Sequence, residues 1–116
     1  MTYADIVAIA KATNGSGERL FSDVAYDHFV EGTNPKPPFL LFHILNSNNF
    51  GADNIVYKKI VELNFEIYTE IKNPEIEKEF EDVLDNAELF YNKNEEWLSE
   101  EKLFVTIYSM EVPYDG

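Results

Sequence analysis

The chain has 116 residues, of which 45% are hydrophobic and 15% aromatic, so we expect one folded domain over residues 1–116 with a real core. Its 22 acidic and 9 basic residues give a formal net charge of −13, which disfavours binding to bare nucleic acid or to an anionic membrane. It contains no cysteine, which excludes disulfides and thiolate metal sites. The N-terminus does not resemble a signal peptide, and no apolar run approaches the ~20 residues of a membrane span. We therefore expect a soluble protein that is made in the cytoplasm.

The first part of the chain predicts a helix and a short strand. Residues 2–13 carry an apolar stripe, and Thr2 and Asp5 have the spacing of a capping box at its start. Asn14-Gly15-Ser16-Gly17 is expected to end the helix. A phosphate-binding loop is the disfavoured alternative for these glycines, because the Gly-Lys-Ser/Thr step is missing and no strand precedes them. Residues 24–29 then predict the first strand.

The middle of the chain predicts two further strands and the loop between them. After a proline-rich loop over 32–38, residues 39–45 are apolar on both faces. They predict a central strand that is either covered on both sides or has one face left for a partner subunit. Residues 46–54 are polar and predict an exposed hairpin loop. Within 53–71 the odd positions from 61 onward are apolar and the even ones mostly polar, which predicts a long strand buried on one face.

The last part predicts a helix followed by two strands. Asn73 is placed to cap an amphipathic acidic helix over about 74–87, with a proline in its first turn. Residues 89–92 and 95–98 predict extended structure, as two runs or as one bent strand, and 103–112 predicts the final strand. The element order is α-β-β-β-α-β-β. It favours an α+β fold in which two helices pack on one face of a mostly antiparallel sheet of four to five strands.

His28 and His43 are the candidates for a metal site or for acid–base chemistry. They fall in separate predicted strands, and Asp27 or Asp53 could complete a group. No ligand spacing such as HExxH is present, so we favour histidines that serve packing or an interface. The acidic run 75–88 could hold catalytic carboxylates or mimic DNA, but its charges lie opposite the apolar stripe, as on any solvated helix. We also find no nucleophilic serine motif, and we expect no enzymatic activity, no cofactor and no metal.

Several blocks of the sequence carry a similarity to a known family. They are Val24-Ala25-Tyr26-Asp27-His28-Phe29, Pro37-Pro38-Phe39, Ala52-Asp53-Asn54 with Val56-Tyr57, Glu66-Ile67-Tyr68-Thr69, Asn73-Pro74-Glu75 with the acidic helix, Ser99-Glu100-Glu101-Lys102-Leu103 and Ile107-Tyr108-Ser109-Met110-Glu111-Val112. In this order they resemble tail terminators, also described as tail completion or head–tail joining proteins. These small proteins are encoded among the structural genes of siphophages and prophages of Gram-positive bacteria. The resemblance covers roughly residues 24–112.

The resemblance implies a small α+β protomer that assembles as a ring, a hexamer, on the end of the tail tube. Such a ring stops tube polymerisation and offers a surface to the capsid connector. The implied partners are further copies of the chain, the major tail protein and a head-closure or connector protein. The implied location is the neck or tail of the virion. The family implies no enzymatic activity, no cofactor, no membrane and no specific binding of nucleic acid.

Within this interpretation we expect the subunit interface in the two-sided strand, in the polar loop after it and in the approach to the long strand. The candidate residues are Phe42, Ile44, Asn48, Asn49, Phe50 and Tyr57. Three alternatives stay open at this point. The first is another neck component, such as a head-closure protein. The second is an acidic inhibitor that mimics DNA, and the third is a small metal-dependent enzyme that uses the two histidines and nearby carboxylates.

Overall fold

The computed structural model describes residues 1–52 and 55–115, and within 46–58 it describes the backbone alone. Two helices and five strands follow one another in the order α-β-β-β-α-β-β, so the predicted α+β class and element order are confirmed. The elements are α1 (Tyr3–Ala10), β1 (Asp23–Tyr26), β2 (Phe39–Ala52), β3 (Ile55–Thr69), α2 (Pro74–Asn86), β4 (Asn92–Leu98) and β5 (Leu103–Pro113).

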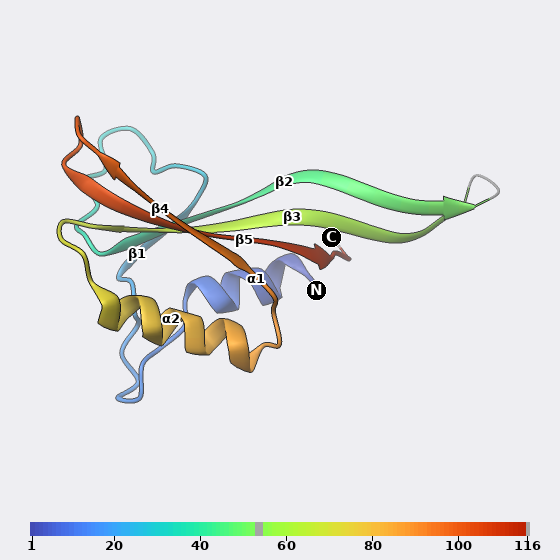
Figure 1. Ribbon diagram of the computed structural model, residues 1–116, viewed down its shortest axis with the longest axis horizontal. Coiled ribbons are helices and arrows are strands. Elements are labelled where there is room, and N and C mark those ends of the chain that lie inside the picture. Colours follow the sequence, from blue (N-terminus) through green and yellow to red (C-terminus); the bar gives the residue numbers. More distant parts are fainter. Residues whose placement is uncertain (53–54, 116) are drawn as a thin grey trace.

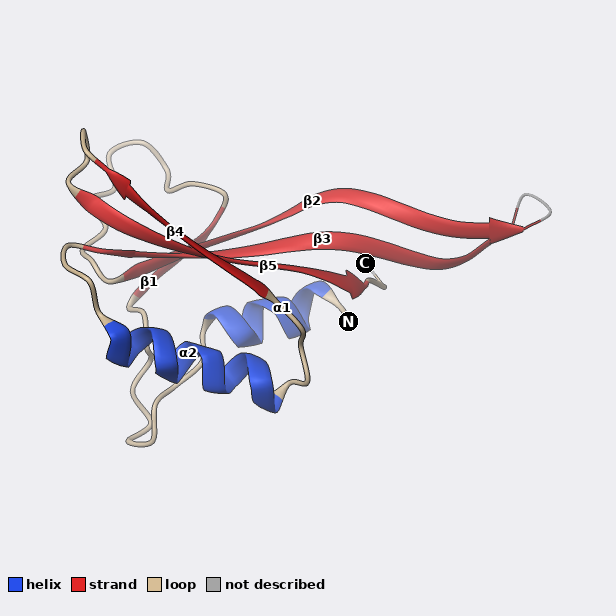
Figure 2. Cartoon of the chain, in the orientation of Figure 1, coloured by secondary structure: helices blue, strands red, loops and turns tan. Residues whose placement is uncertain are grey.

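The five strands form one sheet in the order β1-β2-β3-β5-β4. β1 runs parallel to β2, and the other neighbouring pairs are antiparallel. Both helices lie on the same side of this sheet, and the segment between β1 and β2 loops over the other side (Figure 1). Figure 2 shows the resulting two layers by element type, with the helices against one face of the strands. We call the side that carries the helices the helix face and the opposite side the open face.

The alternation along β3 decides which side chains form the core. The odd-numbered residues of 61–69 are all buried on the helix face. In the strand register, Phe65 lies between Phe42 of β2 and Tyr108 of β5. Phe80 of α2 packs onto this row, and its ring centroid lies 5.4 Å from the ring centroids of both Phe65 and Tyr108. The core is therefore an aromatic row on the sheet, closed by the apolar stripe of α2.

Both helices begin at the residues that the sequence predicts. The side chain of Thr2 accepts a hydrogen bond from the Asp5 backbone N–H, and the Asp5 carboxylate accepts one from the Thr2 backbone N–H, at 3.2 and 2.9 Å. This is the predicted capping box, which satisfies two backbone donors at the start of α1. The side chain of Asn73 accepts from the Ile76 backbone N–H at 3.2 Å and caps α2 in the same way.

The predicted loop over 46–54 is wrong for residues 46–52, which continue β2. The pairing with β3 extends to Ala52 opposite Ile55. Asparagine and serine have a low intrinsic preference for strands, but the backbone ladder with the neighbouring strand outweighs that preference. Asp53 and Asn54, the remainder of the predicted loop, lie outside the described residues.

Three element boundaries also differ from the prediction. α1 ends at Ala10, because the side chain of Asn14 organises a turn soon after it. β1 ends at Tyr26, since Asp27 has a φ of 64° and so leaves the extended conformation. The extended runs expected around residues 89–98 are one strand, which begins only at Asn92.

Candidate functional site: the arm and the free sheet edges

The outer halves of β2 and β3 form a two-stranded ribbon that extends beyond the rest of the sheet (Figure 1). We call residues 46–59 the arm. β1 pairs with β2 only as far as Phe42, and β5 pairs with β3 only from Ile60 inward. Among the described residues, no strand of the chain therefore lies against either edge of the arm. The arm gives the molecule a length of 51 Å, against 32 and 25 Å along its other axes.

An isolated ribbon of this kind is marginally stable in water, and its unpaired backbone groups can pair with another chain. The two edges differ in how accessible they are. At the base of β3, the carbonyl oxygen of Lys59 already accepts a hydrogen bond from the Tyr114 backbone N–H at 2.9 Å. The edge formed by residues 46–52 of β2 has no such neighbour among the described residues. The β2 edge is therefore the better candidate for pairing with another chain.

Tyr26 marks the point on β2 at which the body ends and the arm begins. Its hydroxyl accepts a hydrogen bond from the Ile44 backbone N–H at 3.0 Å and donates one to the Ile44 carbonyl oxygen at 3.3 Å. Its ring packs edge-on against Phe42, with centroids 5.4 Å apart. The register between β2 and β3 then shifts between Ile44 and Ser47. The tyrosine thus satisfies the last backbone groups of β2 before its edge becomes free.

We expect Tyr26→Phe to lower the free energy of unfolding by about 1 kcal/mol, because it leaves the N–H and C=O of Ile44 without their partner. The local effect should be larger than the global one, since Ile44 lies just beyond the last β1–β2 pair, at Phe42. Amide hydrogen exchange measured by NMR should show faster exchange at Ile44. Tyr3→Phe is the control, because the Tyr3 ring packs against Tyr26 and Phe42, whereas the described hydrogen bonds to Ile44 come from Tyr26. Equal exchange in the two variants would contradict the edge-closing role.

The six predicted interface residues fall into two groups. Phe42 is 3% exposed and packs in the core of the protomer, which is a packing role, and its place in a subunit interface stays a prediction. Ile44 is partly buried and packs against the same core. The remaining four lie on the arm, where the structure describes the backbone alone: Asn48, Asn49, Phe50 and Tyr57.

β4 provides a second free edge, which sequence reasoning did not single out. It is the last strand of the sheet and pairs only with β5 among the described residues. Six of its seven residues are exposed, and Trp97 is 51% exposed while its ring rests against Phe104. The run Glu95-Glu96-Trp97 is the one local signal here, since it sets an aromatic residue directly after two charged ones, but it does not show that this strand is an edge.

The lysines on the helix face near β4 hold a buried carboxylate. Glu77 of α2 is 4% exposed and lies between Lys72 and Lys93, with N–O distances of 2.9 and 2.8 Å. Burial by itself would raise the pKa of Glu77, but the hydrogen bonds from the two lysines outweigh it and lower that pKa. Lys93 also pairs with Glu81, and Lys72 pairs with Glu95 of β4. These contacts tie α2 to β4 and serve the fold.

The predicted histidine group lies around Asp27. One ring nitrogen of His28 is 3.0 Å from the Asp27 carboxylate, and His43 Nδ1 is 3.8 Å from the other carboxylate oxygen. His43 Nε2 lies 3.9 Å from Glu66 on the open face. Within the described parts of the chain, no three histidine or carboxylate side chains are placed to hold a metal ion. His43 Nδ1 and the side-chain oxygen of Asn64 are buried without a hydrogen-bond partner among those same residues.

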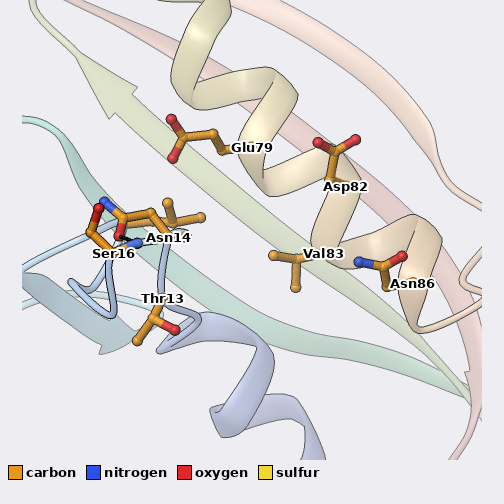
Figure 3. A pocket seen from close by; sticks show the side chains of 9 residues that line it. Thr13, Asn14, Ser16, Glu79, Asp82, Val83 and Asn86 are labelled. Atoms are coloured by element: carbon orange, nitrogen blue, oxygen red, sulfur yellow. Dashed lines mark hydrogen bonds between the residues drawn. The ribbon is translucent and has the colours of Figure 1, made fainter.

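A polar cleft of about 490 Å³ separates α2 from the turn that follows α1. Figure 3 shows Glu79 and Asp82 of α2 across this cleft from Asn14 and Ser16. Asn14 Oδ1 accepts hydrogen bonds from two backbone N–H groups of its own turn, at 2.8 and 3.1 Å. The facing carboxylates repel anions, which further disfavours a phosphate-binding role for the glycines of this turn. The polar groups of the cleft thus serve local structure.

Comparison with known proteins adds no family to this description. No protein-family model matches the chain, and no curated protein matches it. Neither helix, nor any other helical stretch in the described ranges, is long and apolar enough to cross a membrane.

Proposed function

We propose that this chain is a phage virion structural protein of the tail terminator class, which self-assembles as a ring, caps the tail tube and joins the tail to the head. The sequence blocks between residues 24 and 112 support the class. Its partners are further copies of the chain, a hexamer by resemblance, together with the major tail protein and the head-closure or connector protein. Its place is the neck or tail of the virion. The role requires neither catalysis nor a cofactor, neither a membrane nor specific binding of nucleic acid.

The observation that carries the proposal is the arm. A chain that projects paired strands beyond its own body leaves backbone donors and acceptors without partners inside the protomer. Each subunit of a ring must offer its neighbours surfaces for contact, and a projecting arm with free backbone groups is one such surface. The buried side chains that the structure describes lie on the body of the protomer.

The charge of the chain supports the same role. A net charge of −13 is unfavourable for a protein that holds DNA, but it suits the wall of a passage through which DNA must slide without binding. The arm and the negative charge also fit the role of a head-closure protein, which must likewise assemble with other proteins. It is therefore the second candidate, and the position of the protein in the virion distinguishes the two.

Electron microscopy of phage tails made with and without this protein tests the proposal. Without a terminator, tube polymerisation does not stop, so we expect tails of uncontrolled length that are not joined to heads. Tails of normal length that fail to join heads would indicate the head-closure function. Normal, joined tails in the absence of this chain would overturn both candidates.

A further inference from the structure

We propose that the arm of one copy adds as an extra strand to the free edge of β4 in a second copy. The inference deepens the proposed function and rests on it for one point only, that copies of this chain assemble. When each copy offers its arm to one neighbour and its β4 edge to another, the contact is heterologous, and repeated contacts of this kind close into a ring or continue as a filament. The partner is therefore a second copy of the same chain.

The lengths and edges of the two elements match. The free edge of the arm, residues 46–52, has seven residues, and β4 also has seven. Both are the outermost strands on their side among the described residues, so each has a full set of backbone groups to share. The base of the β3 edge is instead occupied by Tyr114, which favours pairing through β2. An antiparallel pairing of the two seven-residue strands places Asn48 opposite Glu96.

The charges of the two elements are complementary. The arm holds Lys58 and Lys59 and one acidic residue, Asp53, in a chain with 22 acidic and 9 basic residues. Lys59 is exposed, and Asn49 lies opposite it in the β2–β3 register. In the proposed pairing, the carboxylates of β4 meet a strand of uncharged residues, and the next strand of the arm carries the two lysines in its sequence. An acidic edge strand discourages pairing with most of this acidic chain and favours the one segment with a basic pair.

β4 also offers what an interface core needs. Trp97 is half exposed beside its free edge, and tryptophan is among the residues that contribute most to binding when a partner covers it. Glu95 is already paired with Lys72, whereas Glu96 is exposed and stands one residue before the tryptophan. Glu96 is therefore the carboxylate to change without disturbing the contacts of α2.

Cysteine trapping tests the contact directly, because the chain has no cysteine of its own. A copy with Asn48→Cys is mixed under oxidising conditions with a copy that carries Glu96→Cys. Opposite residues of paired strands lie within reach of a disulfide, so we expect a covalent dimer of the two variants at least about ten-fold in excess over the control mixture. The control pairs Asn48→Cys with Glu79→Cys, an exposed position on α2. Equal yields in the two mixtures would overturn the proposal.

Charge reversal gives a second, independent readout. Glu96→Lys alone, and Lys58→Glu with Lys59→Glu, should each weaken self-association roughly ten-fold or more, measured by sedimentation velocity. Mixing the two variants should restore it, because each arm then meets an edge of opposite charge. No restoration would contradict the pairing. If trapping succeeds but tails form normally without the chain, the proposed function fails while this inference stands. If tails require the chain but the arm is not trapped on β4, this inference fails while the proposed function stands.

Discussion

Phe80→Ala is expected to lower the free energy of unfolding by about 4 kcal/mol, the largest effect that we predict for a single substitution. Phe80 is fully buried and is the one α2 ring that packs against three others, those of Phe21, Phe65 and Tyr108. Removing it opens a cavity between α2 and the sheet. The strands are fixed by their backbone pairing, so the neighbouring rings cannot move in to fill that cavity.

Urea denaturation followed by circular dichroism measures this loss. Phe90→Ala is the matched control, because the same side chain is removed where it is 94% exposed, and we expect a change within about 0.5 kcal/mol. A loss at Phe80 no larger than that at Phe90 would show that α2 does not close the core.

Lys93→Met should lower the free energy of unfolding by about 2 kcal/mol at neutral pH. Its ammonium group contacts both Glu77 and Glu81, and Glu77 is nearly fully buried. Losing the lysine leaves the buried carboxylate of Glu77 with Lys72 as its remaining cation. Removing one partner of a buried ion pair is destabilising, because the charge that stays behind is only partly compensated. The effect stays below that of a fully buried pair, because Lys93 itself is partly exposed to water. Lys78→Met is the control, since Lys78 forms an exposed pair with Asp82, and we expect little change.

The loss in Lys93→Met should depend on pH in one direction. Glu77 has a lowered pKa in the folded protein, so its ionised form stabilises the fold above its unfolded pKa of about 4.5. This stabilisation disappears as the pH falls through the lower pKa of the folded state. The gap between the wild type and Lys93→Met should therefore be constant near neutrality and narrow below pH 4.5. A gap that widens on acidification would contradict the assigned role of Glu77.

Much of the fold can be read from local patterns in the sequence. The alternation from Val61 onward defines β3 on its own, and the caps at Thr2 and Asn73 define the starts of both helices. In each case the residues that make up the pattern lie close together in the sequence. Such signals are visible without knowledge of the tertiary structure.

The arm and the free β4 edge could not be predicted in the same way. Residues 46–52 are mostly polar or small, and they are strand only because β3 pairs with them. The exposed pattern of β4 resembles a loop, and its attachment to α2 depends on Lys93 reaching Glu77 and Glu81, the latter 12 residues away. A related problem affects Phe42. The strand around it is apolar on both faces, so the sequence does not show which face the helices cover. These features follow from long-range pairing.

The separation of arm and core allows assembly and folding to be tested apart. Replacing residues 50–58 by Asn-Gly keeps Asn49 opposite Lys59 and closes the hairpin with a favourable two-residue turn. This arm-shortened variant keeps every described core residue, so we expect it to unfold with a midpoint close to that of the wild type.

The most direct measurement is the tail length of phage particles that lack this chain and are supplied with either the wild-type protein or the arm-shortened variant. We predict normal tails with the wild type, and tails of uncontrolled length both without the chain and with the folded variant. Normal tails in all three preparations would contradict the proposed function. Tails of normal length with the arm-shortened variant, together with uncontrolled tails in the absence of the chain, would contradict the role of the arm.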